Sequence, residues 1–198
     1  MARRARVPAS DFQFVVSCIA VLWLVFAIDI ALRIGCKVVL AYTLGVRPRE
    51  AVGLLGIVFA PLLHEGFQHL LANSVGLLLL GLISCGYGRR LTLVAVAWSW
   101  PLSGALAWII GAADSVHIGA SGVIFGLIGF LLANGLLRRG CLPQLIALFT
   151  FLLYGAALPM MWPSHERDRM MLMSWEMHLG GFIGGVIASW QVRKRSAG

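Results

Sequence analysis

Charged residues are scarce in this chain of 198 residues. Asp, Glu, Lys and Arg make up 12% of it, and 60% of the residues are hydrophobic. Soluble domains carry about 25% charged residues. So few charges cannot cover a surface that faces water, which excludes a soluble globular domain and a disordered chain. We therefore expect one small domain embedded in a membrane, with an outer surface that faces lipid.

Other common signals are missing as well. The four cysteines form no C-x-x-C pair, so the sequence indicates neither a disulfide framework nor a structural zinc site. Glycine and proline are scattered without a period, and no solenoid repeat is visible. Acidic residues are also few, 8 against 16 Lys and Arg, and the resulting charge of +8 raises the question of nucleic-acid binding.

Six apolar segments approach the length of about 20 residues that a transmembrane helix needs. They are Phe14–Ile34, Leu70–Tyr87, Leu91–Gly111, Ala120–Leu137, Leu142–Trp162 and Met177–Val192. They predict an all-α membrane protein with a six-helix domain over residues 14–192, between an N-terminal segment (1–13) and a basic tail (193–198). The first segment follows three arginines, as a signal peptide would. Because its apolar run is long and no A-x-A site follows, we interpret it as a retained helix.

The basic residues predict how these helices are oriented. With a cytoplasmic N-terminus and six spans, ten of the 16 Lys and Arg fall on the inner side. These ten are Arg3, Arg4, Arg6, Arg89, Arg90, Arg138, Arg139, Arg193, Lys194 and Arg195. Lys and Arg are enriched in cytoplasmic loops. We therefore interpret the charge as a topology signal, expect no nucleic-acid binding, and expect a multi-pass protein of the cell (inner or plasma) membrane with both termini in the cytoplasm.

Two features need separate explanations in this scheme. Val52–Leu63 is apolar but too short to span, and glycine and proline interrupt it, so we expect a loop that lies partly in the outer leaflet. Asp29 lies inside the first span. Arg33 follows it by four residues on the same helix face, and we interpret the two as a structural ion pair.

Polar side chains recur at the outer ends of three alternate segments. The second begins HEGFQHLLANS, with His64, His69 and Asn73. The fourth begins at GASG with Ser121, and the sixth carries His178. Alternate helices run in the same direction, so these residues share one depth near the outer face. Ionisable residues in membrane segments are costly and indicate a functional site.

The spacing of these residues is compatible with catalysis and also with simple packing. His69 and Asn73 share a helix face and could direct two donors to one point, although hydrogen bonding between helices explains them equally well. Ser121 would lie at a helix N-terminus, where backbone N–H groups are free to bind a developing oxyanion. A serine becomes nucleophilic beside a base such as His178.

Two glycine pairs favour a close approach of the fourth and sixth helices. Gly122 and Gly126 form one small-xxx-small face, and Gly181 and Gly185 form another. Glycine and serine are ordinary packing residues in membrane helices, and we expect packing and catalysis to coexist here. Two such faces in contact would bring the hydroxyl of Ser121 within reach of the imidazole.

A metalloprotease is the first alternative. His64, Glu65 and His69 form H-E-x-x-x-H, whereas two zinc ligands on one helix face need a spacing of four, so the pattern disfavours zinc.

Glu176 is only two residues from His178 and points elsewhere on a helix, which predicts a dyad without a third member. His117 and His165 fall in the outer loops without a partner in the pattern, and we interpret them as ordinary loop residues.

Taken together, HEGFQHLLAN, GASGVIFG and HLGGFIGG resemble the rhomboid intramembrane serine proteases, in the order and on the helices of that family, in a minimal six-helix bacterial form. The resemblance implies that Ser121 is the nucleophile and His178 the general base. It also implies an oxyanion hole made by His69, Asn73 and the backbone N–H of Ser121. The substrates would be transmembrane segments of other proteins in the lipid bilayer, cut near the outer face without a metal or cofactor.

The resemblance also assigns roles to residues and segments around the site. His64 and Gly119 would line the site. Val52–Leu63 would be the family's first loop, and Pro163–Trp175 a cap over the site. The Trp-Arg pair that many bacterial members carry in the first loop is missing here. The alternative from another class of function is a catalytically silent rhomboid-like membrane binder or a transporter. The sequence leaves the oligomeric state open.

Overall fold

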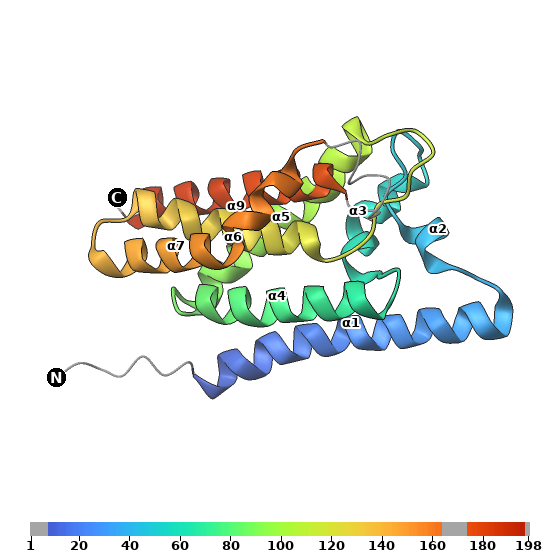
Figure 1. Cartoon of the computed structure of the whole chain (residues 1–198), viewed down its shortest axis with the longest axis horizontal. Coiled ribbons are helices and arrows are strands. Elements are labelled where there is room, and N and C mark those ends of the chain that lie inside the picture. The colour runs from blue at the N-terminus through green and yellow to red at the C-terminus, as the bar shows by residue number, and fades with distance from the viewer. Residues whose placement is uncertain (1–7, 164–173, 197–198) are drawn as a thin grey trace.

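The computed structural model describes residues 8–163 and 174–196, and its regular elements are helices. In chain order they are α1 (Ala9–Cys36), α2 (Leu40–Leu44), α3 (Gly53–Phe59), η1 (Ala60–Leu62), α4 (Phe67–Cys85), α5 (Arg89–Ile110), α6 (Ser121–Leu137), α7 (Cys141–Tyr154), η2 (Gly155–Met161) and α9 (Trp175–Ser196). The long helices run side by side, and α2 and α3 lie at one end (Figure 1). The predicted all-α class is confirmed.

Four helical segments are long and apolar enough to cross a membrane. They are Ala9–Cys36, Phe67–Cys85, Arg89–Ile110 and Cys141–Met161. Four of the six predicted spans therefore have the length and hydropathy of a membrane-spanning helix. The other two predicted segments are helical but lack the length or the mean hydropathy of the first four. Helix α6 has only 17 residues, and α9 has Glu176 in its first turn and basic residues at its end.

Large apolar side chains cover the outside of these helices. Leu24 on α1 is 61% exposed, and Leu152 on α7 is 72% exposed. Continuous apolar surface of this kind is unfavourable in water and marks contact with protein partners or membrane. Together with four segments of spanning length, it identifies a multi-pass membrane protein.

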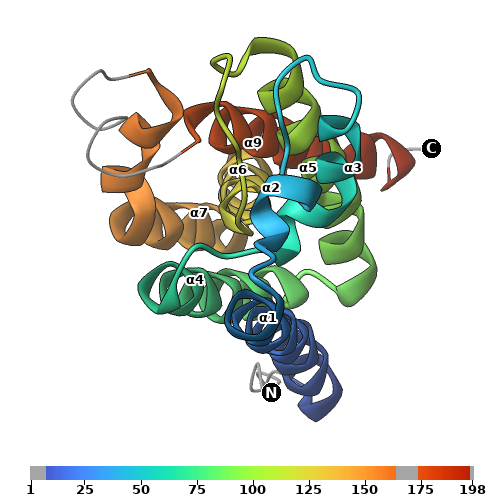
Figure 2. The ribbon, with the colours of Figure 1, turned by 90° about the vertical axis from the view of Figure 1, so that its right-hand side faces the viewer.

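Helix α6 forms the centre of the molecule. Figure 2 shows it surrounded by α4, α5, α7 and α9. Leu127, Ile128, Phe130 and Leu131 are each at most 2% exposed. Because its neighbours bury all of α6 except its ends and Leu132, it does not need the length that a lipid-facing helix requires.

Glycines bring α6 and α9 into backbone contact. A Cβ atom added at Gly181 would clash with the carbonyl oxygen of Gly122, and one added at Gly185 would clash with that of Gly126. Ser99 of α5 packs against Gly126 from another side. Small residues permit this close approach in membranes, and it sets the separation of the two helices.

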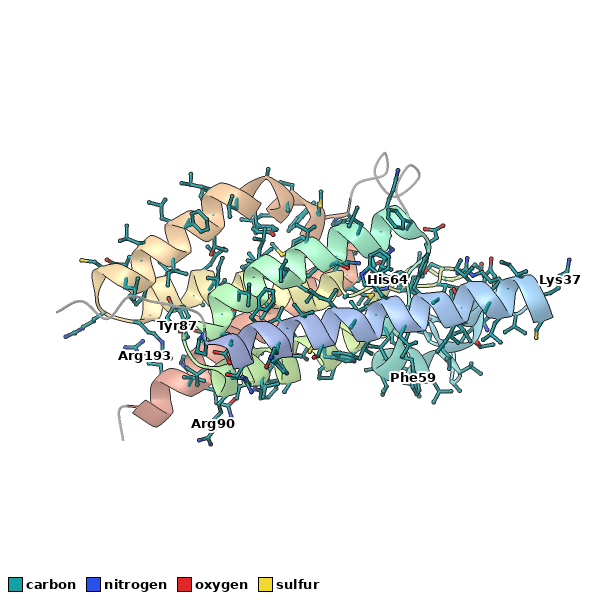
Figure 3. The ribbon with its side chains drawn as sticks, turned by 90° about the horizontal axis from the view of Figure 1, so that it is seen from below. Lys37, Phe59, His64, Tyr87, Arg90 and Arg193 are labelled. Carbon is teal, nitrogen blue, oxygen red and sulfur yellow. The ribbon has the colours of Figure 1, made fainter. Side chains whose placement is uncertain are left out.

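Helix α1 lies along α4 at the edge of the bundle (Figure 3). Asp29 is 3% exposed and pairs with Arg33 at 2.6 Å, which confirms the predicted structural pair. Its second oxygen accepts the backbone N–H of Leu40 at 2.9 Å and so fixes the chain where it turns back after α1. At the opposite end, Asp11 pairs with Arg89 of α5 at 2.6 Å.

The segment Val52–Leu63 does not span, as predicted, but it is more regular than the expected loop. It forms α3 and the short helix η1, because helical hydrogen bonds satisfy backbone groups that have no water partners in an apolar setting. Leu54, Leu55 and Val58 point outward and are about half exposed. Gly56 and Gly104 allow α3 to pack closely against residues 45–46 and against α5.

Candidate functional site

Ser121 and His178 lie side by side although 57 residues separate them in the chain. Ser121 is the first residue of α6, and His178 is in the first turn of α9. His178 Nε2 is 2.9 Å from Ser121 Oγ. The close contact between α6 and α9 brings the two residues together. Ser121 is half-buried and therefore open to a ligand, whereas His178 is 3% exposed.

Two contacts hold the His178 ring. Its Nδ1 donates to the backbone carbonyl of Met160 in η2 at 3.1 Å. That bond places the ring proton on Nδ1, so Nε2 presents a lone pair to the Ser121 hydroxyl. Phe125, one turn after Ser121, stacks on the ring with centroids 4.1 Å apart. An acceptor nitrogen is therefore held in place beside a hydroxyl.

His69 and Asn73 lie on α4 and face the loop that leads to Ser121. A Cβ atom at Gly119 would lie 2.6 Å from His69 Nε2 and 3.6 Å from Asn73 Nδ2. Gly119 also has a φ of +112°, so only glycine fits there without strain. The Asn73 amide nitrogen is buried and has no hydrogen-bond partner among the described residues. A buried donor without a partner is costly, and it is available to a ligand oxygen.

His64 lies between η1 and α4, before the helix begins. Its ring packs edge-on against that of His69, with centroids 5.1 Å apart. Neither ring nitrogen of His64 has a hydrogen-bond partner within the described ranges. The helical spacing argument against a zinc pair therefore does not apply directly, because His64 is outside the helix. Residues 8–163 and 174–196 contain no group of three or more His, Cys, Asp or Glu side chains arranged to hold a metal.

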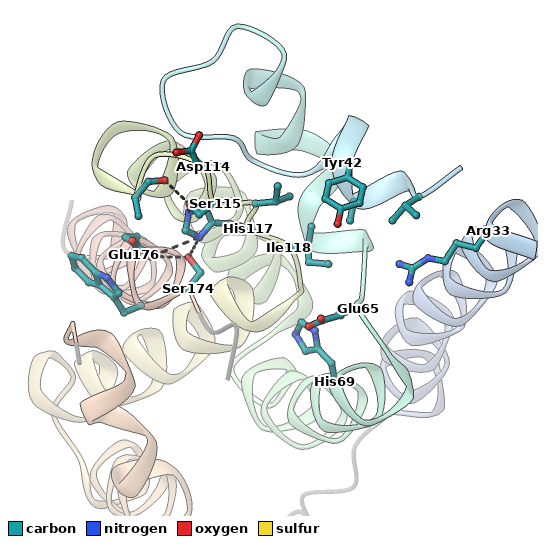
Figure 4. A pocket seen from close by; sticks show the side chains of 15 residues that line it. Arg33, Tyr42, Glu65, His69, Asp114, Ser115, His117, Ile118, Ser174 and Glu176 are labelled. Atoms are coloured by element: carbon teal, nitrogen blue, oxygen red, sulfur yellow. Dashed lines mark hydrogen bonds and ion pairs between the residues drawn. The ribbon is translucent and has the colours of Figure 1, made fainter. Parts of the chain in front are cut away.

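A cavity of about 550 Å³ opens beside these residues at the end of the bundle where α2 lies (Figure 4). Its polar lining includes Glu65, His69, His117, Ser174 and Glu176. Neither Ser121 nor His178 is among its lining residues, and His69 is the predicted site residue that the cavity reaches.

His117 is not an ordinary loop residue, contrary to the prediction from the sequence. It is 8% exposed, and its Nδ1 lies 2.7 Å from the Ser174 hydroxyl. Burial lowers the pKa of His117, and the nearby carboxylate of Glu176 only partly opposes this effect. No spacing rule could reveal this contact, because its partner lies 57 residues away. His165 and most of the predicted cap, Pro163–Trp175, lie outside the described residues.

The chain is similar to several known proteins. A family model described as "Rhomboid domain" matches residues 51–195. The chain is 39% identical over 151 residues to "Uncharacterized protein Rv1337" of Mycobacterium tuberculosis, covering 74% of this chain and 62% of that protein. It is 38% identical over 152 residues to "Uncharacterized protein ML1171" of Mycobacterium leprae, covering 74% and 59%. The chain thus spans less than two thirds of these mycobacterial relatives.

A further relative is aligned over most of both chains. The protein named "Putative rhomboid protease YdcA" of Bacillus subtilis is 31% identical over 179 residues, 89% of this chain and 85% of that protein. No solved structure matches the chain. The family model covers well over half of the sequence, including Ser121 and His178. The chain therefore belongs to the rhomboid family.

Proposed function

We propose that this protein is an intramembrane serine protease that cleaves transmembrane segments of other membrane proteins near the outer membrane face. The observation that carries the proposal is the 2.9 Å contact between Ser121 Oγ and His178 Nε2. The bond from His178 Nδ1 to Met160 supports it, because this bond leaves the correct nitrogen free to accept a proton.

In the proposed reaction, Ser121 attacks the scissile carbonyl while His178 takes the hydroxyl proton. Negative charge then develops on the carbonyl oxygen. The buried Asn73 amide, His69 and the N–H of Ser121 at the start of α6 are the donors for that charge. Collapse of the intermediate breaks the peptide bond as His178 returns its proton to the leaving amine, and water then releases the acyl group by the same route.

The proposal includes six membrane crossings with both chain ends in the cytoplasm. Arg90 and Arg193 lie at one end of the molecule, and Lys37 lies at the other (Figure 3). The end with Arg90 corresponds to the inner loops, which carry the larger share of Lys and Arg. In this orientation α6 crosses at the centre of the bundle, and α9 crosses beside it with Ile183, Val186 and Trp190 exposed on its outer face.

The substrate must expose a carbonyl that a helix normally hides. Every backbone group of a transmembrane helix is satisfied within the helix itself, so the cleaved stretch has to unwind first. Small or helix-breaking residues near the outer face therefore favour cleavage, because they lower the cost of unwinding.

Labelling of Ser121 by a fluorophosphonate probe tests the proposal. Purified wild-type protein is expected to react with one equivalent of probe, and Ser121→Ala is expected to remain unlabelled. Ser115→Ala is the matched control, since it removes a hydroxyl from the neighbouring loop and should be labelled like wild type. Failure of wild type to react while a thermal melt shows folded protein would contradict the protease and favour a catalytically silent membrane binder or transporter.

Asn73→Ala is expected to lower kcat/KM for a cleaved single-span substrate by about 10²–10³-fold. The reason is the loss of one oxyanion donor, which typically costs about 2.7–4 kcal/mol of transition-state stabilisation. The measurement is substrate cleavage in proteoliposomes. Ser74→Ala is the control, because Ser74 is the next buried residue but receives a bond from Trp23 of α1, away from the site. Equal rates for the two variants would exclude Asn73 from the oxyanion hole.

A further inference from the structure

A second group of buried polar side chains lies near the Ser-His pair and is not used by the mechanism above. His117 comes from the loop between α5 and α6, whereas Ser174 and Glu176 come from the start of α9. The three are 8%, 9% and 4% exposed. Figure 4 shows them meeting beside the cavity. Burying three polar groups together is costly unless they satisfy one another.

Ser174 Oγ is the centre of this cluster. It lies 2.7 Å from His117 Nδ1 and 3.1 Å from a carboxylate oxygen of Glu176, and it accepts the backbone N–H of Met177 at 3.1 Å. A hydroxyl has one proton, so it cannot donate to His117 and Glu176 at once. All three contacts of Ser174 Oγ are satisfied when His117 Nδ1–H donates to Ser174 and Ser174 donates to Glu176. The carboxylate thus orients the hydroxyl that receives the imidazole.

The loop side of the cluster is fixed by backbone contacts. His117 exchanges two backbone hydrogen bonds with Val46, at 2.9 and 3.0 Å. Two residues later, Gly119 N–H donates to the carbonyl of Ala60 at 2.8 Å. The Ser115 hydroxyl is 2.8 Å from His117 Nε2 and also donates to the carbonyl of Ala112 at 2.6 Å. The segment that ends at the nucleophile is therefore anchored on the first loop.

The helix side of the cluster leads directly to the base. The backbone carbonyl of Ser174 accepts the N–H of His178 at 3.2 Å, while its side chain caps Met177. The bond from His117 to Ser174 therefore joins the loop before Ser121 to the turn that carries His178. Each end of this connection is four residues from its member of the dyad.

We propose that His117 and Ser174 are positioning residues for the dyad; this inference rests on the protease function proposed above. The glycine faces hold α6 and α9 in contact from Gly122, which directly follows Ser121. The chain segments that precede the two helices are linked separately. The bond between His117 and Ser174 joins the segments that precede α6 and α9. The Ser121–His178 distance is therefore fixed by one contact before the two residues and by another after them. A misplacement of about 1 Å at reacting groups can cost about 10²-fold in rate.

Two substitutions at one position test this role. His117→Asn places an amide nitrogen where Nδ1 lies, within reach of Ser174, whereas His117→Gln reaches the place of Nε2 and Ser115. The rate constant for fluorophosphonate labelling of Ser121 is measured on the full chain, at a temperature where melts show each variant folded. His117→Asn is expected to stay within about twofold of wild type, and His117→Gln is expected to be about tenfold slower or more.

A second matched pair removes one hydroxyl from either side of the imidazole. Ser174→Ala breaks the connection to α9 and is expected to be about tenfold slower, whereas Ser115→Ala leaves that connection intact and is expected to match wild type. Equal rates within either pair, or failure of both His117 variants to fold, would overturn the positioning role. If wild type itself is not labelled, the protease proposal fails; if it is labelled and the pairs do not separate, only this inference fails.

Discussion

Replacing His178 by Ala is expected to slow substrate cleavage by about 10⁴-fold or more, although the protein stays folded. His178 is the proposed base; its Nε2 is within hydrogen-bond distance of Ser121, and Met160 and Phe125 hold its ring in place. Without a base, the serine hydroxyl is a weak nucleophile at neutral pH. Catalysis that remains would come from the oxyanion donors and from substrate binding. The measurement is kcat for a tagged single-span substrate in proteoliposomes.

The double variant Ser121→Ala, His178→Ala gives this prediction a sharper form. Residues that act as one unit lose most of their effect when either is removed. The double variant is therefore expected to cleave no more slowly than the slower single variant. Multiplication of the two losses would show that Ser121 and His178 act independently. A loss below tenfold in His178→Ala alone would point to a different base.

The fold could be anticipated largely because lipid imposes a simple rule on the sequence. Long apolar segments in a bilayer must form helices, since no water is present to satisfy the backbone. All six predicted segments are helical, and α1 and α9 extend beyond the predicted ends. Hydropathy identified α6 and α9 less well, because α6 lies at the centre of the bundle and is short, and α9 contains Glu176, His178 and a basic end. At the centre of the bundle, glycine and polar residues can replace apolar bulk.

The candidate site was only partly visible in the sequence. Ser121, His178 and Asn73 could be singled out because each interrupts an apolar helix. His117 lies in a loop, where a polar residue is unremarkable, so no local signal marks it as buried. Its contact with Ser174 depends on how a loop of irregular backbone folds onto the start of α9. Periodicity arguments apply to helices and strands and do not place such a loop.

The α6–α9 contact leads to the second large effect. Gly181→Ala is expected to destabilise the protein by about 1–3 kcal/mol or more and to slow fluorophosphonate labelling of Ser121. The new methyl group would meet the backbone of Gly122, which has no flexible end that could move aside. The helices would have to separate, and the separation would widen the gap between the hydroxyl and the imidazole. Thermal melts and labelling rates of the purified variant measure both consequences.

Gly35→Ala is the matched control for this substitution. Gly35 is also helical, but a Cβ atom there would have no atom within 4 Å. Alanine favours a helix over glycine by about 1 kcal/mol, so this variant is expected to be as stable as wild type or slightly more stable. The same glycine-to-alanine substitution is therefore expected to have opposite effects on stability at the two positions, because only Gly181 lies in the contact between helices. If Gly181→Ala melts like Gly35→Ala and labels at the wild-type rate, backbone contact between α6 and α9 does not set the geometry of the dyad.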